Sequence, residues 1–138
     1  MRTKFYYIEA TKESPDYHFT EFHVNEVKYR MEFYINLTLN STKIYTSISS
    51  GKKRKLLNIF EEKGIKNNNG LKPLIIAKNI MYEFGCYYKK EWINYGDVFL
   101  CIQWSDNRRK NIYTRLLKEG FRFTKVDNTT TLIKNIGR

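Results

Sequence analysis

The strongest constraint on the fold is a strict alternation of apolar and polar residues between Val27 and Leu39. The residues expected on one face are Val27, Tyr29, Met31, Phe33, Ile35, Leu37 and Leu39. Because successive side chains of a strand point to opposite faces, this period of two predicts a long β-strand with one solvated face. The run from Ile44 to Ile48 alternates in the same way. The polar turn from Asn40 to Thr42 between the two runs predicts an antiparallel hairpin.

Further strands are predicted at both ends of the chain. The segment Lys4 to Ala10 is rich in aromatic and β-branched residues, and the turn residues Ser14 to Asp16 follow it. Val98 to Trp104 is typical of a buried strand. Phe121 to Val126 and Thr129 to Ile133 predict a terminal hairpin, because Asp127 and Asn128 between them favour a tight turn.

Helices are predicted on either side of the buried strand. Leu74 to Phe84 carries apolar residues at helical spacing, with Asn69 as its N-cap and Gly85 as the residue that ends it. Pro73 falls in the first turn, where a missing N–H costs little. A second helix is expected over 105–118, closed by Gly120. The chain is therefore predicted to be a single α+β domain over residues 1–138.

The charge balance predicts an anionic partner. Lys and Arg number 25 against 14 Asp and Glu, a formal net charge of +11, which attracts nucleic acid, the phosphates of a cofactor or an acidic protein surface. No helix-turn-helix, finger or RNA-recognition signature accompanies the charge, so nucleic acid is the less favoured of these. No apolar run approaches the roughly 18 to 20 residues that cross a bilayer. We therefore expect a cytoplasmic protein with no membrane partner.

The cysteines and histidines do not indicate a metal site. Cys86 and Cys101 are too few for a disulfide framework, and with His18 and His23 they make a poor zinc set. We expect two buried free thiols and two histidines on the surface of a strand or loop. No metal is predicted.

The order of elements in the second half of the chain resembles the C-terminal half of the GNAT acetyltransferase superfamily. A loop rich in Asn and Gly precedes a helix, and a strand, a second helix and the closing pair Gly120 and Phe121 follow. The resemblance covers about residues 27–136. It implies a mixed, mostly antiparallel sheet flanked by helices, and acetyl-CoA as the cofactor.

The residues of segment 55–63 and the family resemblance predict different structures for it. Leu56, Leu57, Ile59 and Phe60 form an apolar stripe before Gly64, which favours a helix. The family order instead makes this segment the central strand, splayed from its neighbour to admit the pantetheine arm. Following the resemblance, we predict a strand from Leu56 to Glu61.

The family's cofactor loop reads Gln or Arg, two residues, Gly, one residue, then Gly or Ala. Here Asn67 falls at the first position, Gly70 matches the first glycine and Lys72 replaces the last small residue. The implied cofactor-binding residues are Asn67, Asn68, Asn69, Gly70, Leu71, Lys72 and Asn107. One matching glycine is a weak signal, so a polar loop that only caps a structural helix stays as an alternative.

The resemblance also suggests catalytic residues. The family's tyrosine, which protonates the departing thiolate, is replaced at its usual position by Leu116, while Tyr113 lies one helical turn earlier. Tyr113 is therefore the candidate general acid. Glu61 lies where the family commonly carries a general base, although an acid beside Glu62 and Lys63 is more often solvated charge.

The run Arg108 to Leu117 is similar to divergent GNAT-like proteins of bacteriophages, and the richness in Lys, Asn, Ile and Tyr suits such an origin. Two functions stay open. One is an acyl-CoA-dependent N-acyltransferase of unknown acceptor. The other is a GNAT-shaped protein without catalysis, acting as a virion component or binding a host factor, in the host cytoplasm or in the virion.

Overall fold

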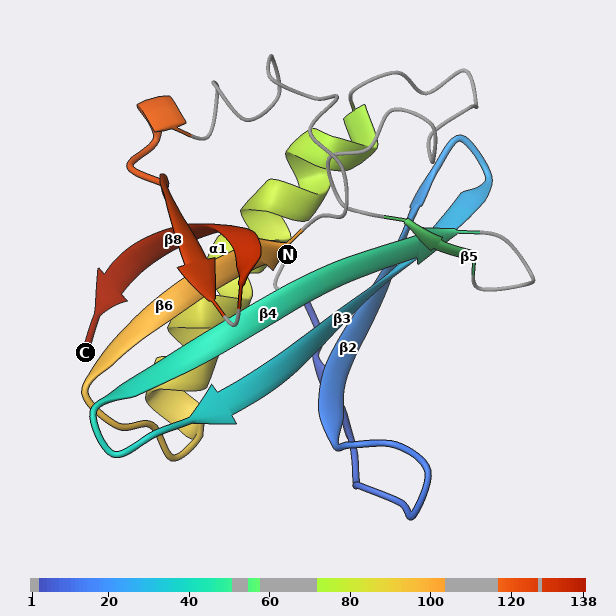
Figure 1. Cartoon of the computed structure of the whole chain (residues 1–138). Helices are drawn as coiled ribbons and strands as arrows, with labels where there is room; N and C mark the ends of the chain where they lie inside the picture. The colour runs from blue at the N-terminus through green and yellow to red at the C-terminus, as the bar shows by residue number, and fades with distance from the viewer. Residues whose placement is uncertain (1–2, 51–54, 58–71, 104–116, 127) are drawn as a thin grey trace.

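The computed structural model describes residues 3–50, 55–57, 72–103, 117–126 and 128–138. These residues form an eight-stranded sheet with helix α1 (Lys72–Glu91) packed on one face (Figure 1). The strands are β1 (Tyr6–Ile8), β2 (Tyr17–Val24), β3 (Val27–Leu37), β4 (Ser41–Ser50), β5 (Lys55–Leu57), β6 (Asp97–Gln103), β7 (Arg122–Val126) and β8 (Thr129–Gly137).

The strands follow the spatial order β1-β2-β3-β4-β6-β8-β7, with β5 paired to β4 beside this path. All paired strands are antiparallel except β4 and β6, which are parallel and connected through α1. A parallel pair needs a long crossover connection, which the helix supplies. The predicted α+β class with a mixed, mostly antiparallel sheet is confirmed. The predicted second helix falls outside the described residues except for Leu117 and Lys118, which are helical.

The predicted central hairpin is confirmed as β3 and β4, whose register runs from the pair of Tyr29 and Ser50 to the pair of Leu37 and Thr42. The turn between them lies at 38–40, two residues earlier than the predicted turn from Asn40 to Thr42. Thr38 N donates to Ser41 O at 2.9 Å, so β3 ends at Leu37, two residues before the alternation in the sequence does.

Strand β2 was not predicted from the sequence. It pairs with β3 along its whole length, and the two are joined by Asn25 and Glu26. Both turn residues have positive φ, 48° and 71°, as a two-residue hairpin turn of type I′ requires. Asn is common at the first position of such a turn, whereas Glu is uncommon at the second. The sequence therefore contained only a weak indication of a hairpin here.

The prediction that Gly85 ends the helix is wrong, because α1 continues to Glu91. Gly85 is buried inside the helix. A Cβ at this position would lie 2.6 Å from Ile136 Cδ1 and 3.2 Å from Leu100 Cδ2. The glycine therefore lets the helix approach β6 and β8 closely. The placement of Pro73 in the first helical turn is confirmed.

The hydrophobic core lies between α1 and the sheet. Phe33 of β3 and Phe84 of α1 stack with ring centroids 4.0 Å apart and an interplanar angle of 6°. The other fully buried core residues with large side chains are Tyr29, Met31, Ile44, Ile48, Met81, Leu100, Ile102 and Leu132. Residues of β3 that alternate with Tyr29, Met31 and Phe33 point to the face opposite α1.

The predicted terminal hairpin is confirmed as β7 and β8. Gly120, with φ of 98°, ends the helical turn before it, and Asn128 adopts φ of 63° in the connecting turn. β8 lies between β6 and β7, so the last strand of the chain is inside the sheet and β7 forms its edge. The predicted buried strand is confirmed as β6.

Candidate functional site

The parallel strands β4 and β6 are the part of the sheet that the resemblance makes important. Among the described residues they pair from Ser41 with Asp97 to Tyr45 with Cys101. Both strands continue beyond this point, β4 to Ser50 and β6 to Gln103, without pairing to each other. The two strands therefore separate toward their carboxyl ends.

The first turn of α1 lies at the same end of the sheet. The helix runs in the direction opposite to β4 and β6, so it begins near their carboxyl ends (Figure 1). Its first turn contains no acidic residue, and Lys72 is exposed there. A helix N-terminus carries free N–H donors and a partial positive charge, which favour an anion. Pro73 removes one of these donors.

Two polar features lie beside the separating strands. Thr46, the residue of β4 just after the last pair with β6, has a buried side-chain hydroxyl that finds no hydrogen-bond partner in the part of the chain that the structure describes. On the face opposite α1, a shallow hollow of about 250 Å³ is lined by Asn36, Tyr45, Gln103, Val126 and Thr129. Tyr45 and Gln103 come from the two strands that separate, so the hollow adjoins the opening.

Most predicted site residues lie outside the described part of the chain. They are the candidate catalytic residues Glu61 and Tyr113, and the candidate cofactor-binding residues Asn67, Asn68, Asn69, Gly70, Leu71 and Asn107. Lys72 is described, as the first residue of α1. The structure therefore brings one predicted site residue to the end of the sheet where the parallel strands part.

Of the predicted strand from Leu56 to Glu61, the structure describes Leu56 and Leu57, which are in a strand, but the prediction that this segment is the central strand is wrong. The described part of this segment is strand β5, but it pairs antiparallel with Ile48 to Ser50 of β4. The strand that runs parallel to β6 and parts from it is β4. The resemblance placed the segment just before the loop at the centre of the sheet, where the structure has β4.

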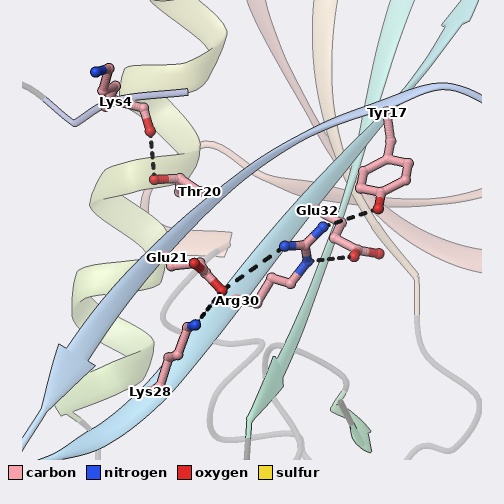
Figure 2. A network of polar contacts seen from close by, with 7 residues as sticks. All are labelled: Lys4, Tyr17, Thr20, Glu21, Lys28, Arg30 and Glu32. Atoms are coloured by element: carbon pink, nitrogen blue, oxygen red, sulfur yellow. Dashed lines mark hydrogen bonds and ion pairs between the residues drawn. The ribbon is translucent and has the colours of Figure 1, made fainter. Parts of the chain in front are cut away.

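A polar network covers the middle of β2 and β3 on the face opposite α1 (Figure 2). The buried Arg30 donates from Nε to Glu32 Oε2 at 2.9 Å and from Nη2 to Tyr17 Oη at 3.0 Å. Its guanidinium lies 3.8 Å from the ring centroid of Phe19. Glu21 Oε2 lies 3.1 Å from Lys28 Nζ and 3.9 Å from Arg30 Nη1. Carboxylates on two strands thus balance the buried charge.

The protonation of this network favours a structural role. Burial opposes the charge of Arg30, but the hydrogen bonds to Glu32 and Tyr17 outweigh burial and raise its pKa. Tyr34 donates to Glu32 Oε1 at 2.8 Å, and burial together with this bond raises the pKa of Tyr34 to about 12. Neither group changes protonation near neutral pH, so neither is suited to general acid or base work there.

The expectation that His18 lies on the surface is wrong. Its side chain faces α1, is 2% exposed and lies among aromatic rings, with the nearest centroid, that of Trp92, at 4.5 Å. Its Nδ1 has no hydrogen-bond partner among the residues that the structure describes. Burial lowers the pKa of His18 from its usual 6.5 to about 4, although Asp16 opposes this shift. His18 is therefore neutral near pH 7. His23 is exposed, as expected.

The two cysteines differ from each other. Cys101 is buried as predicted, and burial raises the pKa of its thiol to about 12, which makes it a poor nucleophile. Cys86 is exposed, contrary to prediction, because it lies on the outer side of α1. In the described ranges, no three His, Cys, Asp or Glu residues gather closely enough to hold a metal ion. No helix in those ranges is long and apolar enough to span a membrane.

The separating strands, the first turn of α1 and the adjoining hollow together make the candidate site. Comparisons of the chain with protein-family models, with curated proteins and with solved structures find no match.

Proposed function

We propose that the protein is a GNAT-like acyl-CoA-dependent N-acyltransferase, with the cofactor lying across the opening between β4 and β6. The observation that carries the proposal is the β4–α1–β6 crossover, in which two parallel strands separate at the end of the sheet where the helix begins. Beyond Tyr45, β4 pairs with β5 from Ile48 to Ser50, so among the described residues the opening meets the backbone of β4 at Thr46 and Ser47. A pantetheine arm needs amide partners of this kind.

The charge at this end supports an anionic cofactor. The first turn of α1 has no acidic side chain and carries the exposed Lys72. These features favour a pyrophosphate. The hydroxyl of Thr46 adds a buried polar group that has no hydrogen-bond partner among the described residues. A bound amide or carbonyl would satisfy it, and buried polar groups are seldom left unpaired.

The proposed reaction is acyl transfer from a thioester to an amine. The amine nitrogen attacks the thioester carbonyl, a C–N bond forms, the C–S bond breaks and coenzyme A leaves as a thiolate. Glu61 is the proposed base that takes the proton from the amine, and Tyr113 is the proposed acid that protonates the thiolate. The acceptor would enter through the hollow that Tyr45 and Gln103 line on the face opposite α1.

A second function is favoured by Pro73 and Lys72. Pro73 leaves the first turn of α1 with one N–H donor fewer, and Lys72 stands where the family has a small residue. Both features weaken a close approach of the backbone to phosphate. A GNAT-shaped protein without catalysis, acting as a virion component or binding a host factor through its basic surface, fits these features.

Calorimetric titration with acetyl-CoA and coenzyme A tests the proposal. We expect saturable binding that survives moderate salt, and we expect Lys72→Glu and Gly70→Trp each to weaken it by tenfold or more. Lys90→Glu is the matched control, because it makes the same charge change in the last turn of the same helix. Lys90→Glu should leave the affinity nearly unchanged.

Binding that moderate salt abolishes, or that both lysine variants weaken equally, would show only attraction of phosphate to the net charge of +11. That outcome would overturn the acyltransferase and favour the protein without catalysis.

A further inference from the structure

Four large apolar side chains are exposed together at the other end of the sheet, where β4 and β6 begin. We call Leu37, Leu39, Ile93 and Tyr95 the loop-tip patch; their exposed fractions are 44%, 92%, 70% and 46%. Leu37 and Leu39 come from the end of β3 and its turn into β4. Ile93 and Tyr95 come from the connection between α1 and β6. Figure 1 shows these two connections together at the lower left.

Hydrogen bonds join the two connections into one unit. Thr42 Oγ1 donates to Tyr95 O at 3.1 Å and accepts from Tyr95 N at 2.8 Å. Gly96 has φ of +57°, and a Cβ at this position would lie 1.9 Å from Asn40 O. A side chain at Gly96 would therefore force the two connections apart.

Further hydrogen bonds, from side chains on the inner side of the loop-tip patch, hold the backbone that carries Ile93. Tyr88 Oη donates to Ile93 O at 3.0 Å, and Asn94 Nδ2 donates to Trp92 O at 3.0 Å and to Lys89 O at 3.2 Å. These bonds hold the backbone on either side of Ile93. The apolar side chains thus project from anchored loops, and a cluster of this kind marks a contact surface.

The net charge of the chain favours one kind of partner for the loop-tip patch. Exposed charges of both signs lie nearby, since Lys90 stands beside Glu91, and Arg138 Nε lies 3.8 Å from Asp97, which also accepts from Asn135 Nδ2 at 2.9 Å. With a net charge of +11, two copies of the chain repel each other, whereas an anionic surface attracts the chain.

Shape and residue type favour a lipid surface. The patch is formed by two turns in which Leu39 and Ile93 are the most exposed side chains and Tyr95 is about half exposed. Tyr and Trp are enriched at the level of lipid headgroups, where their rings are partly apolar and partly hydrogen-bonded. Weak apolar insertion combined with basic residues is the pair of signals that holds a protein at a membrane.

We propose that the loop-tip patch inserts into the interface of an anionic lipid bilayer. Leu39 and Ile93 enter the acyl boundary, Tyr95 lies among the headgroups, and Lys90 and Arg138 approach the phosphates. The prediction of no membrane partner considered spanning segments, and a surface contact requires none. The inference does not depend on the acyltransferase, since the patch is at the opposite end of β4 and β6.

Sedimentation of the purified chain with vesicles tests this inference. We expect partition into vesicles of phosphatidylcholine with phosphatidylserine, and much weaker partition into phosphatidylcholine alone. Leu39→Asp and Ile93→Asp should each reduce partition into the anionic vesicles by tenfold or more. Ile75→Asp is the matched control, because Ile75 is a 50% exposed aliphatic residue on α1. It should bind as the unaltered chain does.

A second measurement separates insertion from attraction by charge. Tyr95→Trp should show a blue shift of tryptophan emission on anionic vesicles, relative to the unaltered chain. Equal loss of partition in Ile75→Asp, or no loss in either tip variant, would overturn the inference. A dimer in solution that Leu39→Asp dissociates, without vesicle binding, would also overturn it and make a second copy the occupant.

Discussion

The two faces of β2 and β3 bury a basic side chain in opposite ways. On the face toward α1, His18 lies opposite Phe33 in the register and has an Nδ1 without a partner among the described residues. On the other face, Arg30 lies opposite Glu21 and donates to Glu32 and Tyr17. The histidine is kept neutral by burial, with its pKa lowered to about 4, whereas the arginine keeps its charge.

This difference follows from what surrounds each group. Burial penalises the charged form, and a histidine can lose its proton in response. Arginine cannot lose its proton in a protein, so it is buried only where carboxylates and hydroxyls match its donors. The face toward α1 is thus stabilised by apolar packing, and the other face of β2 and β3 by paired charges. Three variants test this comparison.

The largest effect is expected from Phe33→Ala, on the face toward α1. Phe33 is fully buried and stacks on Phe84. Its truncation should lower the free energy of unfolding by about 3–5 kcal/mol, through lost transfer energy and the cavity left behind. Urea unfolding followed by circular dichroism measures the change. Tyr34→Phe, on the opposite face of the same strand, should cost only about 1 kcal/mol for its hydrogen bond to Glu32. Equal losses would remove the distinction between the faces.

The next effect is the dependence of stability on pH through His18. The unfolded chain binds this proton below its usual pKa of 6.5, and the folded chain only near 4. The contribution of His18 to the free energy of unfolding is therefore fully present above pH 6.5, decreases as the pH falls to 4 and changes no further below 4. The shift corresponds to roughly 3 kcal/mol.

We expect His18→Phe to remove this contribution in unfolding curves measured between pH 7 and 4. His23→Phe is the control, because His23 is exposed. The His23→Phe variant should lose as much stability between pH 7 and 4 as the unaltered chain does. The same acid dependence in the His18→Phe variant as in the unaltered chain would show that other groups cause it.

A smaller effect is expected from Arg30→Met on the face opposite α1. The change removes the ion pair with Glu32 and the contact with Phe19, so stability should fall by roughly 1–3 kcal/mol. Lys28→Met removes a charge that pairs with Glu21 at an exposed position and should cost less than about 0.5 kcal/mol. Urea unfolding of both variants at low and high salt measures the difference.

A double-mutant cycle with Glu32→Gln then isolates the pair. A coupling free energy near zero would contradict the view that paired charges stabilise this face.

Parts of the candidate site followed from the sequence to different degrees. The helix after the Asn-rich loop was predicted from Leu74, and it is described from Lys72, which the resemblance placed in the cofactor loop. The opening itself was assigned to the wrong strand, because which strand pairs in parallel with β6 depends on contacts distant in the chain. The burial of the Thr46 hydroxyl without a described hydrogen-bond partner could not be predicted, since it depends on the residues that surround Thr46 in the fold. No pattern in the residues from Tyr17 to Val24 predicted the burial of His18.

The sequence by itself determined the elements whose signal is local. These are the β3–β4 hairpin, β6, the terminal hairpin and the start of α1, because side-chain alternation and turn residues act between neighbours in the chain. The tertiary structure alone decided the strand order, the burial of His18 and the continuation of α1 through Gly85. Gly85 serves a close approach to β6 and β8, and that reason exists only once helix and sheet have met. The loop-tip patch likewise arises from two turns that lie 53 residues apart at Thr42 and Tyr95.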